Sequence, residues 1–183
     1  MIAIVSSVGG LDALGRVLRA LPAQLRAPVI ALQHTDPGRV SSLDRLLGQT
    51  TALAVGVAED GTGLEPGRVY VAPSGFHTLI TRDRTVATVR SGQFPPSRPS
   101  ADLLLTSLAV AVGADAVAVV LTGLGHDGAA GVTAVKRLGG TVIASTLATS
   151  QEPSMPEAAI DTGQVDRVLD LEDIGPALAR LAA

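Results

Sequence analysis

The chain has 183 residues, of which 46% are hydrophobic and 17% charged, and its formal net charge is −3. This composition is typical of a globular protein with a core large enough to fold without disulfides. The absence of cysteine excludes thiol nucleophiles and thiolate metal sites. One Tyr, two Phe and no Trp are too few to stack single-stranded nucleic acid, and the negative charge offers no basic surface for duplex DNA, so we expect no nucleic-acid partner.

The sequence shows no signal for a membrane or for export. No apolar run has the length of a membrane span, and Met1–Gly10 lacks the basic start and long apolar stretch of a signal peptide. We therefore expect a cytoplasmic protein without membrane insertion.

The opening of the chain predicts alternating strands and helices. Ile2–Val5 is an apolar run that ends in Ser and Gly residues, as a buried strand would. Apolar residues then recur at helical spacing over Leu11–Leu21, before Pro22. Pro28–Gln33 predicts a second strand and Val40–Leu47 a second helix. This order of elements indicates a parallel sheet.

The middle of the chain predicts short strands at Leu53–Val57, Arg68–Ala72, His77–Thr81 and Thr85–Val89. The turn-like residues Arg82–Arg84 indicate a hairpin between the last two. A proline-rich loop follows over Phe94–Ser100. We expect Ser100 to be the N-cap of a helix that ends near Val112.

The second half returns to alternating strands and helices. The predicted strands are Ala116–Leu121, Thr141–Ala144 and Val165–Asp170, and the predicted helices are a segment ending near Leu138, Glu157–Thr162 and Leu171–Leu181. A polar loop is expected over Ser145–Pro156. The whole pattern predicts one α/β domain over residues 1–183: a doubly wound, mostly parallel sheet with helices on both faces and a small antiparallel hairpin insertion.

Polar residues at the ends of the predicted parallel strands suggest a hydrolytic site. Ligands of such sheets bind at the carboxyl ends of the strands. Ser6 and Ser7 follow the first strand, His34 follows the second, and Asp127 lies in the glycine-rich turn after Ala116–Leu121. If these strands are neighbours, the hydroxyl, imidazole and carboxylate of a nucleophilic triad share one edge. Taken alone, however, either serine is better explained as a helix cap.

Two other histidines compete with His34 for the role of base. His77 falls in the antiparallel region, where we expect a structural or surface role. His126 stands beside Asp127 in the glycine-rich turn and is the stronger competitor.

The glycine-rich turn also permits a different function. Gly123–Gly128 satisfies G-x-G-x-x-G, follows a strand and opens a helix, as a dinucleotide-binding turn does. Against this, Asp127 would place a carboxylate beside the phosphates, and Ser145 and Thr146 stand where an acidic residue is expected about 20 positions on. The residues alone therefore leave a hydrolase and a nucleotide-binding module as close competitors.

Several motifs, in order, resemble the catalytic domain of the chemotaxis protein-glutamate methylesterases, the CheB-like family. The three main motifs are Ser-x-Gly-Gly at Ser7–Gly10, Gln-His with a following Pro-Gly turn at Gln33–Gly38, and Leu-Thr-Gly-x-Gly-x-Asp-Gly-Ala at Leu121–Ala129. Further matches are Pro66–Pro73, Arg98–Asp102 and Met155–Ala159. The resemblance covers nearly the whole chain.

The resemblance implies that Ser7 is the nucleophile, His34 the base and Asp127 the orienting acid. The implied reaction hydrolyses γ-methyl esters of glutamates in the cytoplasmic helical region of chemoreceptors, through an acyl-enzyme and without metal or cofactor. Some relatives also deamidate receptor glutamines by the same chemistry.

The backbone near the implied nucleophile is the expected place for oxyanion and substrate contacts. The residues in question are Val8, Gly9 and Leu124. Family members usually carry Thr where Val8 stands and Met where Leu124 stands, so substrate orientation is expected to differ. The segment Ser145–Pro153 departs most from the family, which affects the expected rim of the substrate site.

Many relatives carry an N-terminal receiver domain. Here the first predicted strand begins at Ile2, so we expect no receiver in this chain and a separate response regulator as partner. A non-catalytic relative that docks on receptors is the remaining alternative, since Val8 lacks a side-chain hydroxyl.

Overall fold

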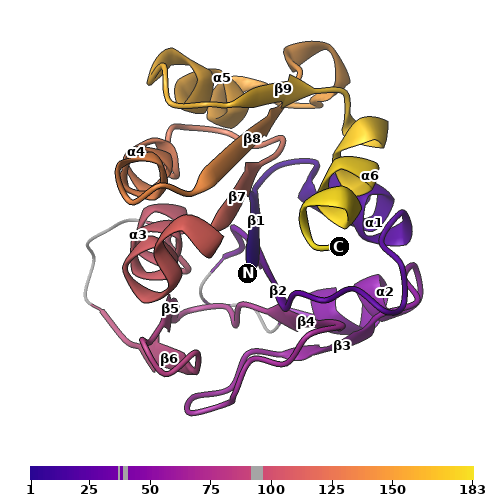
Figure 1. Cartoon of the computed structure of the whole chain (residues 1–183), viewed down its shortest axis with the longest axis vertical. Helices are drawn as coiled ribbons and strands as arrows, with labels where there is room; N and C mark the ends of the chain where they lie inside the picture. The colour runs from indigo at the N-terminus through magenta and orange to yellow at the C-terminus, as the bar shows by residue number, and fades with distance from the viewer. Residues whose placement is uncertain (37, 39–40, 92–96) are drawn as a thin grey trace.

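The computed structural model describes residues 1–36, 38, 41–91 and 97–183. In this part of the chain, seven strands form one parallel sheet (Figure 1). In sheet order they are β3 (Ala54–Val57), β4 (Arg68–Val71), β2 (Val29–Gln33), β1 (Ile2–Ser6), β7 (Val117–Val120), β8 (Thr141–Ser145) and β9 (Arg167–Leu169). The sheet confirms the predicted α/β architecture, and β1 lies between β2 and β7.

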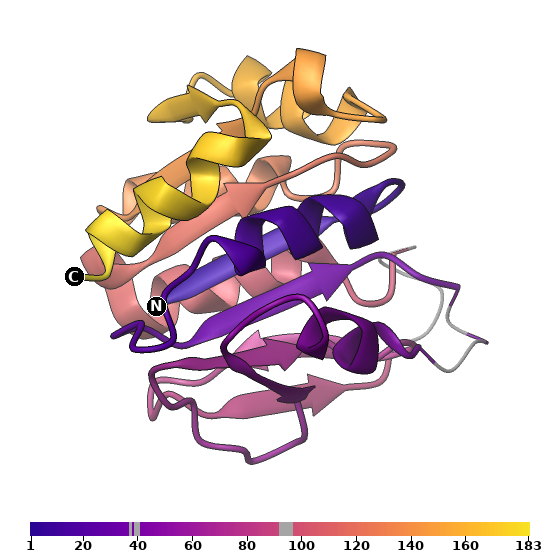
Figure 2. The same cartoon turned by 90° about the vertical axis from the view of Figure 1, so that its right-hand side faces the viewer.

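Helices cover both faces of this sheet (Figures 1 and 2). One face carries α1 (Gly10–Arg19), α2 (Leu43–Gly48) and α6 (Leu171–Leu181). The other face carries α3 (Ala101–Val112), α4 (Ala129–Arg137) and α5 (Ser154–Asp161). Short 3-10 turns occupy Gly113–Asp115 and Leu147–Thr149.

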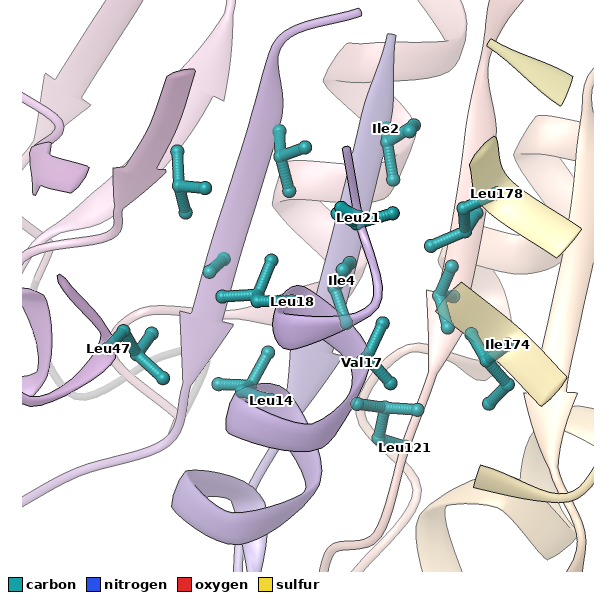
Figure 3. Close-up of a cluster of buried hydrophobic side chains, with 14 of the residues drawn as sticks. Ile2, Ile4, Leu14, Val17, Leu18, Leu21, Leu47, Leu121, Ile174 and Leu178 are labelled. Carbon is teal, nitrogen blue, oxygen red and sulfur yellow. The ribbon is translucent and has the colours of Figure 1, made fainter. Parts of the chain in front are cut away.

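The central strand β1 shows why its sequence is apolar throughout. Successive side chains of a strand point to opposite faces, and a parallel sheet is buried on both. Ile2 and Ile4 therefore pack into the core beneath α1 and α6, while Ala3 and Val5 pack into the core beneath α3 and α4. Figure 3 shows the first of these cores, where aliphatic side chains of β1, α1 and α6 meet. This aliphatic packing takes the place of the aromatic residues that the chain nearly lacks.

The middle of the chain is divided between two sheets. β3 and β4 are parallel members of the main sheet, whereas β5 (His77–Ile80) and β6 (Val86–Val89) form an antiparallel hairpin. The hairpin turns at Arg84, a non-glycine residue with φ of 58°, as the predicted turn requires. It packs against α3, where the Ile80 N–H donates to Ser107 Oγ at 3.0 Å.

Some predicted boundaries are wrong. The helix expected at Val40–Leu47 begins at Leu43, and Val40 lies outside the described residues, as does the start of the expected loop at residues 94–96. The helix α5 begins at Ser154 rather than Glu157, because Pro156 falls in its first turn, where the N–H that proline lacks would have no helical partner.

The cap predicted for α3 is confirmed, since Ser100 Oγ accepts the Leu103 N–H at 3.4 Å. Among the described residues, no helix combines the length and the apolar character needed to cross a membrane.

Candidate active site

The three residues of the expected triad follow three adjacent strands. Ser7 comes directly after β1, His34 directly after β2, and Asp127 lies in the turn between β7 and α4. Two backbone hydrogen bonds continue the sheet by one residue: the His34 N–H donates to Ser6 O, and the Ser7 N–H donates to Thr122 O, both at 2.9 Å. The register thus holds Ser7 between His34 and the glycine-rich turn.

His34 and Asp127 are joined by a hydrogen bond. His34 Nε2 lies 2.8 Å from Asp127 Oδ2, and the two side chains are 14% and 17% exposed. A carboxylate can only accept, so Nε2 carries the proton and Nδ1 is the nitrogen left to take a proton from a nucleophile. This is the base–acid pair that a triad requires.

The Asp127 carboxylate is also held by the start of α3. Oδ2 accepts the Ala101 N–H at 2.8 Å, and Oδ1 accepts the Asp102 N–H at 2.9 Å and the Ser100 hydroxyl at 3.1 Å. Burial by itself raises the pKa of Asp127, but the hydrogen bonds from His34 and the two N–H groups outweigh it and leave the pKa below its ordinary value. Asp127 is therefore ionised and oriented before any substrate binds.

The structure distinguishes the two neighbouring serines. Ser6 is fully buried, and its hydroxyl donates to Leu32 O at 3.2 Å. Ser7 is partly exposed, in the turn between β1 and α1. Among the described residues, Ser7 Oγ makes no hydrogen bond, including to His34; catalytic contacts of this kind often tighten only when substrate binds.

Glycines allow the close approach of three segments around Ser7. A Cβ on Gly123 would lie 2.7 Å from Ser7 Cβ and 3.0 Å from Ser7 N, closer than packing allows. Gly9, the N-cap of α1, has φ of 78°, and a Cβ there would meet the Gln151 side chain at 2.7 Å. Only glycine fits these two positions.

Thr122 links the turn at Ser7–Gly9 to the segment at 145–156, and the sequence did not predict it as a site residue. Its hydroxyl lies 3.0 Å from Val8 O and accepts the Glu152 N–H at 2.9 Å. Gly123 N donates to Glu152 O at 2.8 Å, and Met155 N donates to Gly123 O at 2.9 Å. Two signals in the sequence mark Thr122: it directly follows a strand of the sheet, and it is the Thr of the motif at Leu121–Ala129.

The backbone around Ser7 has N–H groups that are free to bind an oxyanion. Within the described ranges, the N–H groups of Val8, Gly9 and Leu124 have no hydrogen-bond acceptor. The residues Val8 and Leu124 are 47% and 63% exposed, and their apolar side chains form an apolar rim beside these donors. A cavity of about 510 Å³ adjoins this rim and is lined by Leu103, Leu124, His126 and Asp127, among others.

The dinucleotide alternative meets a physical obstacle at the start of α4. Asp102 Oδ1 accepts the N–H groups of Gly128 and Gly131 at 2.9 and 2.7 Å, so the donors that a phosphate would need are already bonded. Burial raises the pKa of Asp102 and the nearby Asp127 charge adds to this, against the hydrogen bonds that lower it. A phosphate there would face two carboxylates.

Among the described residues, neither of the other two histidines is hydrogen-bonded to Asp127. His77 is buried, with Nε2 2.7 Å from Ser91 Oγ, which agrees with the expected structural role. His126 is exposed on the glycine-rich turn. Across residues 1–36, 38, 41–91 and 97–183, no group of three His, Cys, Asp or Glu side chains is placed to hold a metal ion. The expectation that no cofactor is needed stays a prediction.

Comparison with known families decides the assignment. The family model described as CheB methylesterase matches residues 2–178. The chain belongs to the CheB methylesterase family. The crystal structure of the Thermotoga maritima CheB methylesterase catalytic domain is 36% identical, with a TM-score of 0.94 over 98% of this chain and 97% of that one. The resemblance in the motifs is thereby confirmed, as is the predicted fold class.

Curated relatives carry names that describe an activity. Proteins of Maricaulis maris and Geobacillus kaustophilus named protein-glutamate methylesterase/protein-glutamine glutaminase are each 39% identical over 185 aligned residues. These alignments cover 100% and 99% of this chain but 46% and 53% of the relatives. The chain thus spans about half the length of these CheB methylesterase relatives.

Proposed function

We propose that this member of the CheB methylesterase family is a serine hydrolase that removes γ-methyl esters from glutamates of chemoreceptors and deamidates glutamines at such sites. The observation that carries the proposal is the 2.8 Å hydrogen bond between His34 and Asp127, at the sheet edge where Ser7 directly follows β1. The names of the curated relatives supply the substrate class.

The proposed reaction has two stages. Ser7 Oγ attacks the ester carbonyl and transfers its proton to His34 Nδ1, while Asp127 stabilises the imidazolium that forms. The tetrahedral oxyanion takes hydrogen bonds from backbone N–H groups at Val8 and Leu124. When it collapses, His34 returns the proton to the leaving methoxide, and methanol departs.

In the second stage, water replaces the hydroxyl nucleophile. His34 removes a proton from water, which attacks the acyl-enzyme carbonyl, and the second tetrahedral intermediate expels Ser7 Oγ as it regains the proton. The products are free enzyme and a glutamic acid side chain, which releases its proton to solvent and becomes the carboxylate. With a glutamine substrate, ammonia leaves in the first stage instead of methanol.

The proposed substrate segment is the cytoplasmic helical region of a chemoreceptor. The apolar rim of Val8 and Leu124 beside the donors supports a protein side chain as the acyl group. We propose that residues 1–183 act as one catalytic domain, since the seven-stranded sheet takes its strands from both ends of the chain, and that a response regulator is a partner. The cytoplasmic location stays a prediction.

The test is release of methanol from receptors whose glutamates carry tritium-labelled methyl esters. We expect Ser7→Ala to lower kcat by about 10³-fold or more. Ser6→Ala is the matched control, because Ser6 is buried and bonded to Leu32 O, and it should keep near wild-type activity. Undiminished release by Ser7→Ala would overturn the proposal.

A further inference from the structure

Ser100 stands out as a buried hydroxyl in contact with the proposed orienting acid. It is 1% exposed, and its Oγ lies 3.1 Å from Asp127 Oδ1. Its oxygen also accepts the Leu103 N–H at 3.4 Å. A hydroxyl has one proton, and ionised Asp127 can only accept, so the proton of Ser100 points at the carboxylate.

The main chain of Ser100 is held by His77 on the antiparallel hairpin. The Ser100 N–H lies 3.3 Å from His77 Nδ1, and a backbone N–H can only donate, so Nδ1 carries no proton. His77 Nε2 therefore carries it and donates to Ser91 Oγ at 2.7 Å. Burial, and next the charge of Arg98, lower the pKa of His77, which favours this neutral form.

The two carboxylate oxygens of Asp127 have different hydrogen-bond partners. Oδ2 faces His34, whereas Oδ1 is held by the Ser100 hydroxyl and the Asp102 N–H. Two contacts on Oδ1 restrict rotation of the carboxylate about its terminal torsion, which is otherwise broad. Rotation would carry Oδ2 away from the plane in which it orients the His34 ring.

We propose that Ser100 is a positioning residue of the esterase, held by His77, whose hydroxyl fixes the Asp127 carboxylate so that His34 is aligned for proton transfer. This rests on the function proposed above. It also gives the antiparallel hairpin a task, since β5 supplies the residue that holds Ser100.

The experiment compares Ser100→Ala and Ser100→Gly with the wild-type chain. Gly is well tolerated at an N-cap, so this variant removes the hydroxyl with little loss of helix stability. Ser107→Ala is the matched control: it lies on the same helix and loses a bond to the same hairpin, but away from Asp127. Ser100→Thr keeps the hydroxyl and tests for rescue.

Two readouts are measured for each variant: methanol release from tritium-methylated receptor, and the rate of Ser7 labelling by a fluorophosphonate. We expect Ser100→Ala and Ser100→Gly to lower kcat about tenfold with KM within about twofold, which corresponds to about 1.4 kcal/mol. The labelling rate should fall in parallel. Ser107→Ala should lower Tm without lowering kcat, and Ser100→Thr should restore most of the activity.

Several outcomes would overturn the inference. One is a kcat within twofold of wild type in both Ser100→Ala and Ser100→Gly. Another is an equal loss of kcat in Ser107→Ala, which would show a general effect of weakening α3. If the wild-type chain is labelled but releases no methanol, the proposed substrate is wrong, and the labelling rates alone still decide the role of Ser100.

Discussion

Replacing Asp127 by Asn probes the proposed site most informatively, because the change is isosteric and the structure identifies the donors that the described residues place around the carboxylate. Two donors face each oxygen: His34 and the Ala101 N–H face Oδ2, and Ser100 and the Asp102 N–H face Oδ1. An amide keeps one oxygen and puts an NH₂ group in place of the other, so that donors meet donors on one side.

Either orientation of the amide leaves one backbone N–H without an acceptor. If the NH₂ group faces Ser100, the Ser100 hydroxyl can rotate and accept a hydrogen bond from it, but the Asp102 N–H can only donate and loses its acceptor. If the NH₂ group faces His34, the imidazole can change tautomer and accept a hydrogen bond from it, but the Ala101 N–H can only donate and loses its acceptor. One unsatisfied buried donor costs about 1–3 kcal/mol. Loss of the charge at the start of α3 adds about 0.3–1 kcal/mol, so we expect a loss of unfolding free energy of about 1–4 kcal/mol.

The loss of catalysis should be larger than the loss of stability. In one orientation His34 is forced into the tautomer whose Nδ1 is protonated and cannot accept the proton of Ser7. In the other, no charge stabilises the imidazolium. The corresponding change in a serine protease triad lowers kcat about 10⁴-fold, and we expect a loss of that order.

The assay pairs urea unfolding with methanol release, at a temperature where the variant is folded. Asp166→Asn is the matched control, because Asp166 lies away from the site but also has a carboxylate that bonds a backbone N–H. It accepts the Val142 N–H at 2.8 Å and forms an ion pair with Lys136. It should lose stability and keep kcat. An Asp127→Asn variant with kcat within tenfold of wild type would refute the role given to Asp127.

Three further predictions follow from individual contacts. Gly123→Ala should lower kcat about 100-fold or more, because its Cβ would displace Ser7, whereas Gly56→Ala, with nothing within 4 Å of the added atom, should keep wild-type kcat. Because the pKa of Asp127 is lower in the folded chain than its ordinary value of about 3.9, its carboxylate stabilises the fold above that pH, and this stability is lost as pH falls through the folded-state pKa. Urea unfolding at a series of pH values should therefore show that the difference in unfolding free energy between the wild-type chain and Asp127→Asn shrinks below about pH 4. Leu178→Ala, at a fully buried position of α6, should cost about 2–5 kcal/mol of unfolding free energy with kcat unchanged.

The sequence predicted that these three residues share one edge of the sheet, because this placement follows from a general rule. Ser7, His34 and Asp127 each follow a parallel strand, and the apolar runs that mark those strands are continuous because both faces of the sheet are buried. The adjacency of β1, β2 and β7 then brings the three residues to one edge.

The supporting contacts could not be predicted in the same way. Asp127 accepts N–H groups at the start of α3, and Asp102 accepts N–H groups at the start of α4, so each helix start is bonded to a carboxylate about 26 residues away. Capping rules describe only local pairs, and nothing in the spacing of these residues signals such an exchange. The same holds for Thr122, whose partners come from two distant turns.

The most direct test of the account is the site of covalent labelling by a fluorophosphonate, mapped by mass spectrometry of peptides. The account predicts modification of Ser7 and not of the buried Ser6, with labelling abolished in Ser7→Ala and strongly slowed in His34→Ala. A chain that stays unlabelled would be a non-catalytic relative. Labelling at another residue, or at an undiminished rate in His34→Ala, would equally contradict the triad of Ser7, His34 and Asp127.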